Sequence, residues 1–346
     1  MSNILILGAG AMGTAFSFPC SDNGHSVSIV GTHLENSFID KINSNRYHPF
    51  LNCKIPKNVK FFKFEKLEQV LNKKIDLIAV AVISKGIEWA SKVIGKSLKK
   101  NVPILILTKG ILLNNNKYEV LAHTMKRILK DNGIKKSNIS ATAGPCLAKG
   151  LANRVHTSVI FANSDLKAVR KIAKLASTDY YHISLSKDVV GIEICAAIKN
   201  IYAMIIGASQ GLCLTNNLEE IKKNNYLNTA AALLQQSIFE MITFTEKLKG
   251  KKESVLGLAG IGDLYVSADG GRNSKMGYYL GQGIKFANAK KFKMSTETVE
   301  GADLTKEIGF QVKKDFDKKK LPLMFSLIET ICNEKPLKVD WKNFVK

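Results

Sequence analysis

Short apolar runs, separated by polar or glycine-rich breaks, fill the first half of the chain. Residues 4–7 and 27–30 are two such runs, and residues 75–82 form a longer run that is almost continuously apolar. An unbroken apolar run of this kind is typical of a strand buried on both faces of a parallel sheet. Further strands are predicted at 103–107, 139–142 and 155–162, helices at 37–46, 65–73, 117–131 and 165–177, and a loop at 47–60. The alternation of strands and helices over about 185 residues predicts a doubly wound α/β sheet.

The pattern changes after Asp188. Residues 189–208 are mainly apolar and contain many small side chains, which suits the central helix of a helical domain. Further helices are predicted at 229–245, at 303–314 and within 317–335. We therefore divide the chain into an α/β domain over residues 1–188 and an all-α domain over residues 189–346.

The composition is that of a globular protein large enough for two well-filled cores, with 346 residues of which 45% are hydrophobic. The longest apolar runs have the length of a strand, so no membrane-spanning helix is expected. The first strand starts almost at the N-terminus, which leaves no room for a signal peptide. The six cysteines are scattered without a C-x-x-C pair, so we expect free thiols in a reducing cytoplasm and no zinc site.

The formal net charge of +22 comes largely from short lysine pairs along the chain, such as Lys73-Lys74 and Lys251-Lys252. A nucleic-acid surface would be expected to combine such lysines with clustered arginines and stacking aromatic residues. We interpret the lysines as decoration of solvated surfaces and expect no nucleic-acid partner. The positive field would still attract an anionic substrate, such as a sugar phosphate or a polyol phosphate.

Gly8, Gly10 and Gly13 follow the first predicted strand and open a predicted helix. In this setting the first glycine makes a tight turn, the second lets the backbone approach a pyrophosphate, and the third allows close packing of helix and strand. The phosphates then lie on the free N–H groups at the start of the helix. The stretch therefore predicts a dinucleotide-binding site.

The end of the second predicted strand bears on the choice of dinucleotide. NAD-selective folds often carry an acidic residue there, which accepts hydrogen bonds from the ribose hydroxyls. Here the strand is followed by Gly31 and Thr32, and no carboxylate comes before Glu35. We expect Thr32 to lie beside the dinucleotide, and the choice between NAD and NADP stays open.

Two lysines stand where chemistry is expected. Lys109 follows the predicted strand at 103–107, and ligands of doubly wound sheets bind beyond the carboxyl ends of the strands. Lys199 lies in the middle of the long apolar helix, where an unpartnered ammonium group costs several kcal/mol. The alternatives are a surface lysine at 109 and a side chain at 199 that reaches solvent. We favour a functional role for Lys199, and for Lys109 the residues alone leave the two possibilities even.

Two polar turns follow in the second half. The glycine-dense stretch 257–264 presents one carboxylate, that of Asp263. The second turn contains Arg272, whose planar guanidinium suits a phosphate, and Asn273, which can both donate and accept hydrogen bonds. The alternative for the second turn is an ordinary surface turn with an exposed arginine.

Taken together, these residues resemble the NAD(P)-dependent glycerol-3-phosphate dehydrogenase family. The matching pieces are Gly8-Ala9-Gly10-Ala11-Met12-Gly13-Thr14-Ala15, Thr108-Lys109-Gly110, Gly144-Pro145 with Ala148, Ala197-Ile198-Lys199-Asn200, Gly257-Leu258-Ala259-Gly260-Ile261-Gly262-Asp263-Leu264, Arg272-Asn273 and Val299-Glu300-Gly301. They span nearly the whole chain, and the 257–264 stretch is much more specific than the glycine turn.

The resemblance implies a Rossmann domain followed by a helical substrate domain, with the active site between them, in a cytoplasmic homodimer. It implies reversible reduction of dihydroxyacetone phosphate to sn-glycerol 3-phosphate with NAD or NADP. By resemblance Lys199 is the general acid/base, and Lys109 and Asp263 are its polar partners, all three with catalytic roles. The implied substrate-binding residues are Lys109, Gly144, Asp263, Arg272 and Asn273. The implied dinucleotide-binding residues are Gly8, Gly10, Ala11, Met12, Gly13, Thr32, Lys109, Ala148, Arg272 and Glu300.

The chain departs from the family pattern in four places. Residues 212–228 are longer, more polar and richer in lysine and asparagine than the usual short glycine-rich loop. Gly271 stands where serine or threonine is common, and Cys146 replaces a polar residue. Pro19 falls inside the first predicted helix and predicts a kink or an early end. The first two departures leave open another short keto-sugar or polyol phosphate as substrate, and a non-catalytic NAD(P)-binding regulator is a further alternative.

Overall fold

The computed structural model of the chain describes residues 1–98, 101–214 and 226–344. The chain forms two compact units. Unit 1 comprises Met1–Ile111 and Glu119–Glu193, and unit 2 comprises Leu112–Tyr118 and Ile194–Lys346. Unit 1 therefore extends a few residues beyond 188, and a short internal segment of the first half belongs to unit 2.

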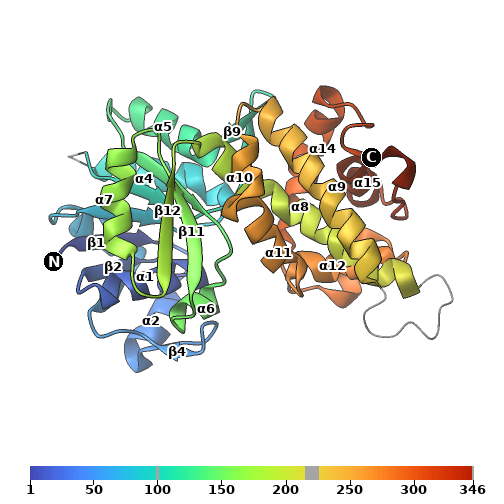
Figure 1. Ribbon diagram of the computed structural model, residues 1–346. Helices are drawn as coiled ribbons and strands as arrows, with labels where there is room; N and C mark the ends of the chain where they lie inside the picture. Colours follow the sequence, from blue (N-terminus) through green and yellow to red (C-terminus); the bar gives the residue numbers. More distant parts are fainter. Residues whose placement is uncertain (99–100, 215–225, 345–346) are drawn as a thin grey trace. The chain divides into compact units, whose positions relative to one another are not determined.

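Across the described part of unit 1 runs an eight-stranded sheet (Figure 1). Its strand order is β12-β11-β10-β7-β6-β1-β2-β5, and neighbours are parallel except for β10 and β11. The strands are β1 (Asn3–Leu7), β2 (Ser26–Val30), β5 (Val59–Phe62), β6 (Leu77–Val80), β7 (Ile104–Ile106), β10 (Ile139–Ala143), β11 (Thr157–Ala162) and β12 (Tyr181–Ser186). From β1 the chain builds the sheet toward one edge, and from β6 toward the other. The carboxyl ends of β1 and β6 therefore mark the switch point at which such sheets bind ligands.

Helices of unit 1 connect these strands. They are α1 (Ala11–Asp22), α2 (Asn36–Asn45), α3 (Leu67–Leu71), α4 (Ile87–Ser97), α5 (Leu121–Asp131), α6 (Ala148–Ala152) and α7 (Leu166–Ala176). α1 packs against α6, and α4 packs against α5. All four side chains of β6 are fully buried, as its unbroken apolar run predicts. The doubly wound α/β fold expected from the sequence is confirmed.

Three local predictions in unit 1 were wrong. The loop expected at 47–60 contains the short strands β3 (Tyr47–His48) and β4 (Cys53–Lys54) and the start of β5. Of the two effects predicted for Pro19, the early end of α1 is wrong, because the helix continues to Asp22 with Pro19 inside it. The helix expected at 117–131 begins only at Leu121, and a strand takes up its first residues.

That strand, β9 (Lys117–Val120), forms a hairpin with β8 (Ile111–Asn114). Asn115 and Asn116 join them with φ angles of 50° and 59°. Two consecutive residues with positive φ match the tight turn that suits the twist of a hairpin, and asparagine is one of the few residues that tolerates it. Tyr118 packs edge-on against Phe244 and Phe316 of unit 2.

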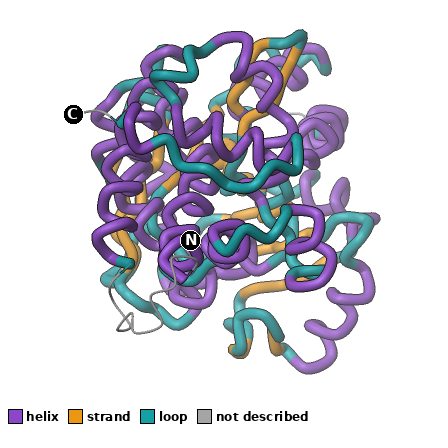
Figure 2. The backbone as a smooth tube through the Cα atoms, turned by 90° about the vertical axis from the view of Figure 1, so that its right-hand side faces the viewer, coloured by secondary structure: helices purple, strands orange, loops and turns teal. Residues whose placement is uncertain are grey.

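From the start of α8 onward, the described residues form helices and turns without a strand (Figure 2). The helices of this part are α8 (Val189–Leu214), α9 (Leu227–Lys247), α10 (Lys252–Leu256), α11 (Asp263–Ala268), α12 (Arg272–Gly281), α13 (Phe286–Asn288), α14 (Glu300–Asp315) and α15 (Pro322–Cys332). The all-α character of the second half is confirmed. The long insertion expected within 212–228 lies mostly at 215–225, outside the described residues.

α8 corrects one premise of the sequence analysis. Its 26 residues are long and apolar enough to cross a membrane by length and composition, so the apolar runs are not all of strand length. However, 89% of its most apolar window is buried inside the protein, as in the core helix of a soluble domain. Glycines on its surface allow very close packing: a Cβ on Gly207 would lie 2.5 Å from the Cα of Ser274.

Candidate active site

The glycine turn between β1 and α1 is shaped by three different requirements. Gly8 has a φ of +112°, and a Cβ there would lie 2.6 Å from the carbonyl oxygen of Ala81. A Cβ on Gly13 would lie 2.4 Å from the oxygen of Gly8, so this residue lets α1 pack closely on the turn. A Cβ on Gly10 would meet nothing within 4 Å. Space at Gly10 is therefore left for something other than protein.

The N-terminus of α1 suits an anion at this place. Gly10 occupies the N-cap in an extended conformation and has no side chain to bond to the N–H groups of the first turn. Those N–H groups, including the ones of Ala11 and Met12, lack intrahelical partners, and the helix dipole favours negative charge there. The open space at Gly10 and these donors together fit the pyrophosphate of a dinucleotide.

A carboxylate from the start of α2 reaches back toward the end of β2. Glu35 folds back so that its Oε2 accepts the N–H of Thr32 at 2.7 Å and the N–H of Ala9 at 3.2 Å. Ala9 lies in the glycine turn, so Glu35 connects the turn with the segment after β2. The sequence indicated no carboxylate at this strand end, because the folding back of a residue further along cannot be seen in a linear pattern.

Lys109 and Gly144 are brought together in unit 1. The Nζ of Lys109 donates to the carbonyl oxygen of Gly144 at 3.3 Å, and Gly144 has a φ of +128°. Both line a small pocket that also includes Met12 of the first turn of α1 and Cys146. Ala148 opens α6, which packs against α1. Of the residues predicted for the site, Met12, Lys109 and Gly144 therefore line one small pocket next to the glycine turn.

In unit 2, Lys199 on α8 is only 6% exposed and forms a buried ion pair with Asp263, which is 2% exposed. Asp263 is the first residue of α11 and follows a π-helical turn at Leu258–Gly262. The Nζ of Lys199 also donates to the hydroxyl of Ser267 at 2.7 Å. Ser267 in turn donates to the carbonyl oxygen of Asp263 at 2.7 Å. The ammonium group is thus held in place by groups from α11.

Ser267 was missed by the sequence analysis. It follows Asp263 by one helical turn, so both side chains lie on one face of α11 and reach the same lysine. The i, i+4 spacing was a usable signal, but the stretch was interpreted as a turn, and a turn has no such face.

The π-helical turn at Leu258–Gly262 requires glycine because the chain approaches itself closely there: a Cβ on Gly260 would lie 2.0 Å from the oxygen of Val255.

A second polar network adjoins Lys199 in the sequence. Asn200 accepts from the Nδ2 of Asn273 at 3.1 Å and donates to Glu300 at 3.2 Å. The N–H of Gly301 donates to the side-chain oxygen of Asn273 at 2.9 Å. The other carboxylate oxygen of Glu300 accepts from Arg272 at 2.9 Å, and both of these side chains are about half exposed. Arg272 and Asn273 begin α12, so a basic group stands at a helix N-terminus.

Two further buried carboxylates lie away from these residues. Burial raises the pKa of Glu240 to about 7, although the N–H groups of Leu323 and Met324 and the side chains of Gln236 and Tyr202 oppose the rise. Through these bonds Glu240 anchors the first turn of α15. Burial likewise raises the pKa of Glu193 to about 8, and the N–H of Ala122 at the start of α5 donates to its carboxylate. Both carboxylates fasten helix ends.

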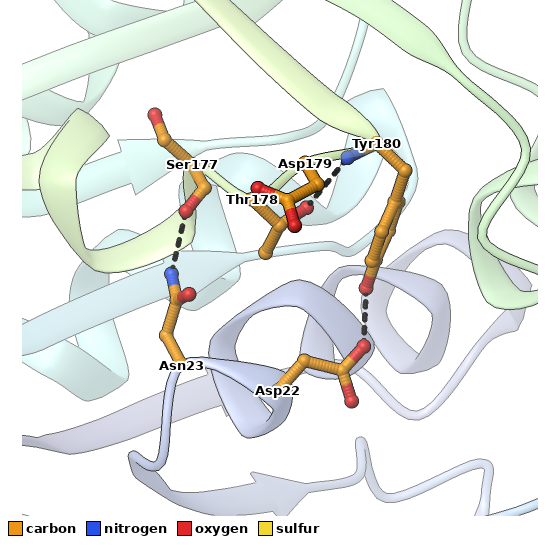
Figure 3. Close-up of a pocket in the computed structure, with 6 residues that line it drawn as sticks. All are labelled: Asp22, Asn23, Ser177, Thr178, Asp179 and Tyr180. Atoms are coloured by element: carbon orange, nitrogen blue, oxygen red, sulfur yellow. Dashed lines mark hydrogen bonds between the residues drawn. The ribbon is translucent and has the colours of Figure 1, made fainter.

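A separate hollow lies at the other end of α1 from the glycine turn (Figure 3). It is lined by Asp22, Asn23, Ser177, Thr178, Asp179 and Tyr180. Its polar groups bond to each other and to Arg154: Tyr180 donates to Asp22 at 2.6 Å, and Arg154 forms two hydrogen bonds to the same carboxylate. It contains none of the predicted site residues. Among the residues that the structure describes, no group of three or more potential ligands is placed to hold a metal ion.

Comparison with known proteins assigns both halves of the chain to one enzyme family. The family model described as NAD-dependent glycerol-3-phosphate dehydrogenase N-terminus matches residues 3–169, and the one described as its C-terminus matches residues 188–340. An NADP(+)-dependent glycerol-3-phosphate dehydrogenase of Archaeoglobus fulgidus is 31% identical over 286 residues, covering 83% of this chain and 82% of that protein. This chain belongs to the NAD-dependent glycerol-3-phosphate dehydrogenase family.

Other members of the family agree over the whole length. A glycerol-3-phosphate dehydrogenase [NAD(P)+] of Phytoplasma mali is 27% identical over 347 residues, covering 99% of this chain and 97% of that protein. The solved structure of the Plasmodium falciparum glycerol-3-phosphate dehydrogenase matches with a TM-score of 0.82 at 20% identity, covering 100% of this chain and 95% of that one. The Coxiella burnetii structure matches with a TM-score of 0.80 at 24% identity, covering 97% and 96%. The family predicted from the sequence is confirmed, and these structures share its fold.

Proposed function

We propose that this chain reversibly reduces dihydroxyacetone phosphate to sn-glycerol 3-phosphate with NADH or NADPH, and that Lys199 is the general acid/base. As a member of the family, the chain is an NAD(P)-dependent oxidoreductase that acts on a phosphorylated substrate. The observation that supports the role of Lys199 is its burial in the middle of the apolar helix α8, with its ammonium group held by Asp263 and Ser267.

The residues of unit 1 account for dinucleotide binding. Gly10, Ala11 and Met12 present the space and the N–H groups for the pyrophosphate, while Gly8 and Gly13 make the turn that exposes them. Thr32 lies at the end of β2, where the adenosine ribose is bound in such folds, and Ala148 belongs to the helix that packs on α1. When bound, the dinucleotide supplies the hydride that adds to the carbonyl carbon of the substrate.

The residues of unit 2 account for the proton. As the carbonyl carbon is reduced, its oxygen gains negative charge and needs a proton, which the Nζ of Lys199 donates. In the reverse direction the neutral amine accepts the hydroxyl proton. Asp263 and Ser267 hold the amine in one position, so the side chain of Lys199 does not have to change rotamer before the proton is transferred. Lys109 contributes a second positive charge near the substrate.

Arg272 is suited to the phosphate group of the substrate. Its guanidinium forms bidentate hydrogen bonds with phosphate oxygens, and its partial exposure leaves it accessible to a ligand. We assign Asn273 and Gly144 to the same substrate, Asn273 beside Arg272 and Gly144 beside Lys109. Glu300 holds the guanidinium, and we place Arg272 and Glu300 near the dinucleotide as well. Gly271 lacks a hydroxyl group that a serine or threonine would offer to the substrate.

The decisive test follows absorbance at 340 nm with NADH or NADPH and a panel of short keto phosphates. Dihydroxyacetone phosphate is expected to give the highest kcat/KM. Turnover with another keto phosphate and none with dihydroxyacetone phosphate would show a related dehydrogenase, as Gly271 and the 212–228 segment left open. Dinucleotide binding without turnover on any member of the panel would instead show a regulator.

We further propose that the enzyme is a cytoplasmic homodimer. The support for a cytoplasmic compartment is that the six cysteines, all within the described residues, form no disulfide, which suits a reducing compartment. The homodimer is what the family resemblance implies. Light scattering after gel filtration is expected to give twice the mass of the 38.1 kDa chain. A mass of one chain at micromolar concentration contradicts the dimer.

A further inference from the structure

We infer that Glu35 is a positioning residue for the dinucleotide: its carboxylate fastens the glycine turn to the segment after β2 and does not select between NAD and NADP. The inference rests on the proposed function in one respect, namely that the glycine turn binds a dinucleotide. It assigns a role to a residue that neither the motif nor the proposed mechanism uses.

The hydrogen bonds of the turn divide it into an anchored part and an open part. The N–H of Gly8 donates to the oxygen of Val30 at 2.8 Å, and the N–H of Ala9 donates to Glu35. The carbonyl oxygen of Ala9 accepts from the hydroxyl of Thr14 at 3.1 Å. The Ala9 peptide is therefore held on both sides. The open part begins at Gly10, where a Cβ would meet nothing within 4 Å, and continues into the first turn of α1, whose N–H groups lack intrahelical partners.

Gly31 makes the folding back of Glu35 possible. A Cβ on Gly31 would lie 2.4 Å from the Cδ1 of Ile39 and 3.2 Å from the Cβ of Glu35. A side chain at the end of β2 would thus compete with Glu35 for the same space. The usual acidic residue at this strand end is absent, and a carboxylate from the start of α2 occupies the position beside it.

The partners of Glu35 decide between two possible roles. A carboxylate that selects NAD keeps its oxygens for the ribose hydroxyls and repels the 2′-phosphate of NADP. In this chain one oxygen of Glu35 accepts two backbone N–H groups, and such charge-assisted bonds are the stronger class of hydrogen bond. Because Oε2 of Glu35 holds the backbone of the turn, both dinucleotides meet the same positioned turn.

The test compares Glu35→Ala and Glu35→Gln with the unchanged chain. Trp89 packs edge-on against His33, the residue after Thr32, so energy transfer from tryptophan to bound NADH or NADPH gives dissociation constants directly. We expect Glu35→Ala to raise both constants by the same factor, about tenfold, because two N–H groups lose a charged acceptor. Glu35→Gln keeps one amide oxygen and is expected to raise them about threefold. The KM for dihydroxyacetone phosphate and the kcat at saturating dinucleotide should change far less.

Asp40→Asn is the matched control. Asp40 lies on α2, is 60% exposed, and pairs with the side chain of Lys63 instead of with the backbone. This substitution should leave both dissociation constants unchanged. The inference is overturned if the Glu35 variants bind both dinucleotides as tightly as the unchanged chain. It is equally overturned if NADPH binding improves while NADH binding weakens, since that pattern identifies a selecting carboxylate.

The same experiment separates failure of the inference from failure of the proposed function. If the unchanged chain binds both dinucleotides, loses affinity in Glu35→Ala, and turns over no keto phosphate, the proposed activity is wrong and the positioning role stands. If it turns over dihydroxyacetone phosphate and the Glu35 variants have the affinities of the unchanged chain, the activity stands and the positioning role is wrong.

Discussion

The site residues of unit 1 and those of unit 2 differ in the atoms they use, main-chain atoms in unit 1 and side-chain atoms in unit 2. The group in unit 1 is made mostly of main chain: three glycines, the N–H groups of a helix end, and a carboxylate that is itself bonded to the backbone. The group in unit 2 is made of side chains, with a buried Lys199–Asp263 pair at its centre. A main-chain site is damaged by atoms that are added, whereas a side-chain site is damaged by atoms that are removed. Substitutions of the two kinds therefore distinguish binding from chemistry.

The largest effect is expected from Lys199→Ala. Loss of a general acid lowers kcat by about a thousandfold or more, because the developing oxygen charge is no longer protonated. The dissociation constant for NADH should hardly change, since Lys199 is not among the residues proposed to bind the dinucleotide. Steady-state kinetics and tryptophan-to-NADH energy transfer measure the two quantities. The control is Lys252→Ala, at an exposed lysine of α10, which should leave kcat unchanged. A kcat of Lys199→Ala within tenfold of that of the unchanged chain excludes the acid/base role.

A second prediction concerns the buried carboxylate that fastens α15. The pKa of Glu240 in the folded chain is about 7, above the ordinary value of 4.5. The contribution of Glu240 to the free energy of unfolding is therefore full below pH 4.5. It falls by about 3 kcal/mol as the pH rises to 7. The free energy of unfolding of Glu240→Gln should lack this loss when denaturation is followed from pH 5 to pH 8. The exposed Glu246 on the same helix, changed to Gln, should keep the pH dependence of the unchanged chain.

The third prediction uses two glycines of the same turn. Gly10→Ala adds a methyl group to open space, so the melting temperature should stay the same while the dissociation constant for NADH rises about tenfold or more. Gly13→Ala places the same group against the oxygen of Gly8, so it should lower the free energy of unfolding by about 1–3 kcal/mol. Thermal melting and dinucleotide binding separate the two effects. Equal melting temperatures for both variants would disprove the assignment of Gly13 to packing and of Gly10 to dinucleotide binding.

The smallest effect is expected from Ser267→Ala. Removing the hydroxyl leaves the Lys199–Asp263 pair intact but frees one side of the ammonium group, and kcat should fall about tenfold. Ser267→Thr keeps the hydroxyl and should restore most of the activity. The KM for NADH is the internal control, because Ser267 is not among the residues proposed to bind the dinucleotide. A kcat of Ser267→Ala equal to that of the unchanged chain shows that Ser267 does not position the amine.

Periodicity was sufficient for most of the fold. Six of the eight strands of the sheet, the long apolar helix and the change of pattern near Asp188 follow from burial on two faces or on one, which is visible in a linear pattern. The two strands that were not predicted are β5 and β12. The hairpin at 111–120 was missed because its strands are short and Leu121–Asp131 extends a helical pattern into them. Asn115-Asn116 was the available signal, since two adjacent residues that tolerate positive φ favour a tight hairpin turn.

The site was harder to predict than the fold. Lys199 stood out because a lysine in an apolar helix demands a partner, and Asp263 stood out as the one carboxylate of a glycine-rich stretch. Their pairing could be expected only from the family resemblance, because 64 residues separate them in the chain. Ser267 and Glu35 were missed for the same physical reason. Each acts through a local backbone shape, a helical face in one case and a folded-back side chain in the other, that composition does not reveal.

The hairpin has a consequence for how the protein is made. The ribosome delivers Tyr118 early, yet the rings of Phe244 and Phe316 that cover it are synthesised much later. During translation the ring of Tyr118 therefore stays exposed until the later residues have been synthesised. A gene cut after Glu193 would encode a first half with a bare aromatic ring, and a gene started at Ile194 would encode a second half with a hole in its aromatic cluster. The two halves can be separated cleanly only if residues 112–118 are moved with the second.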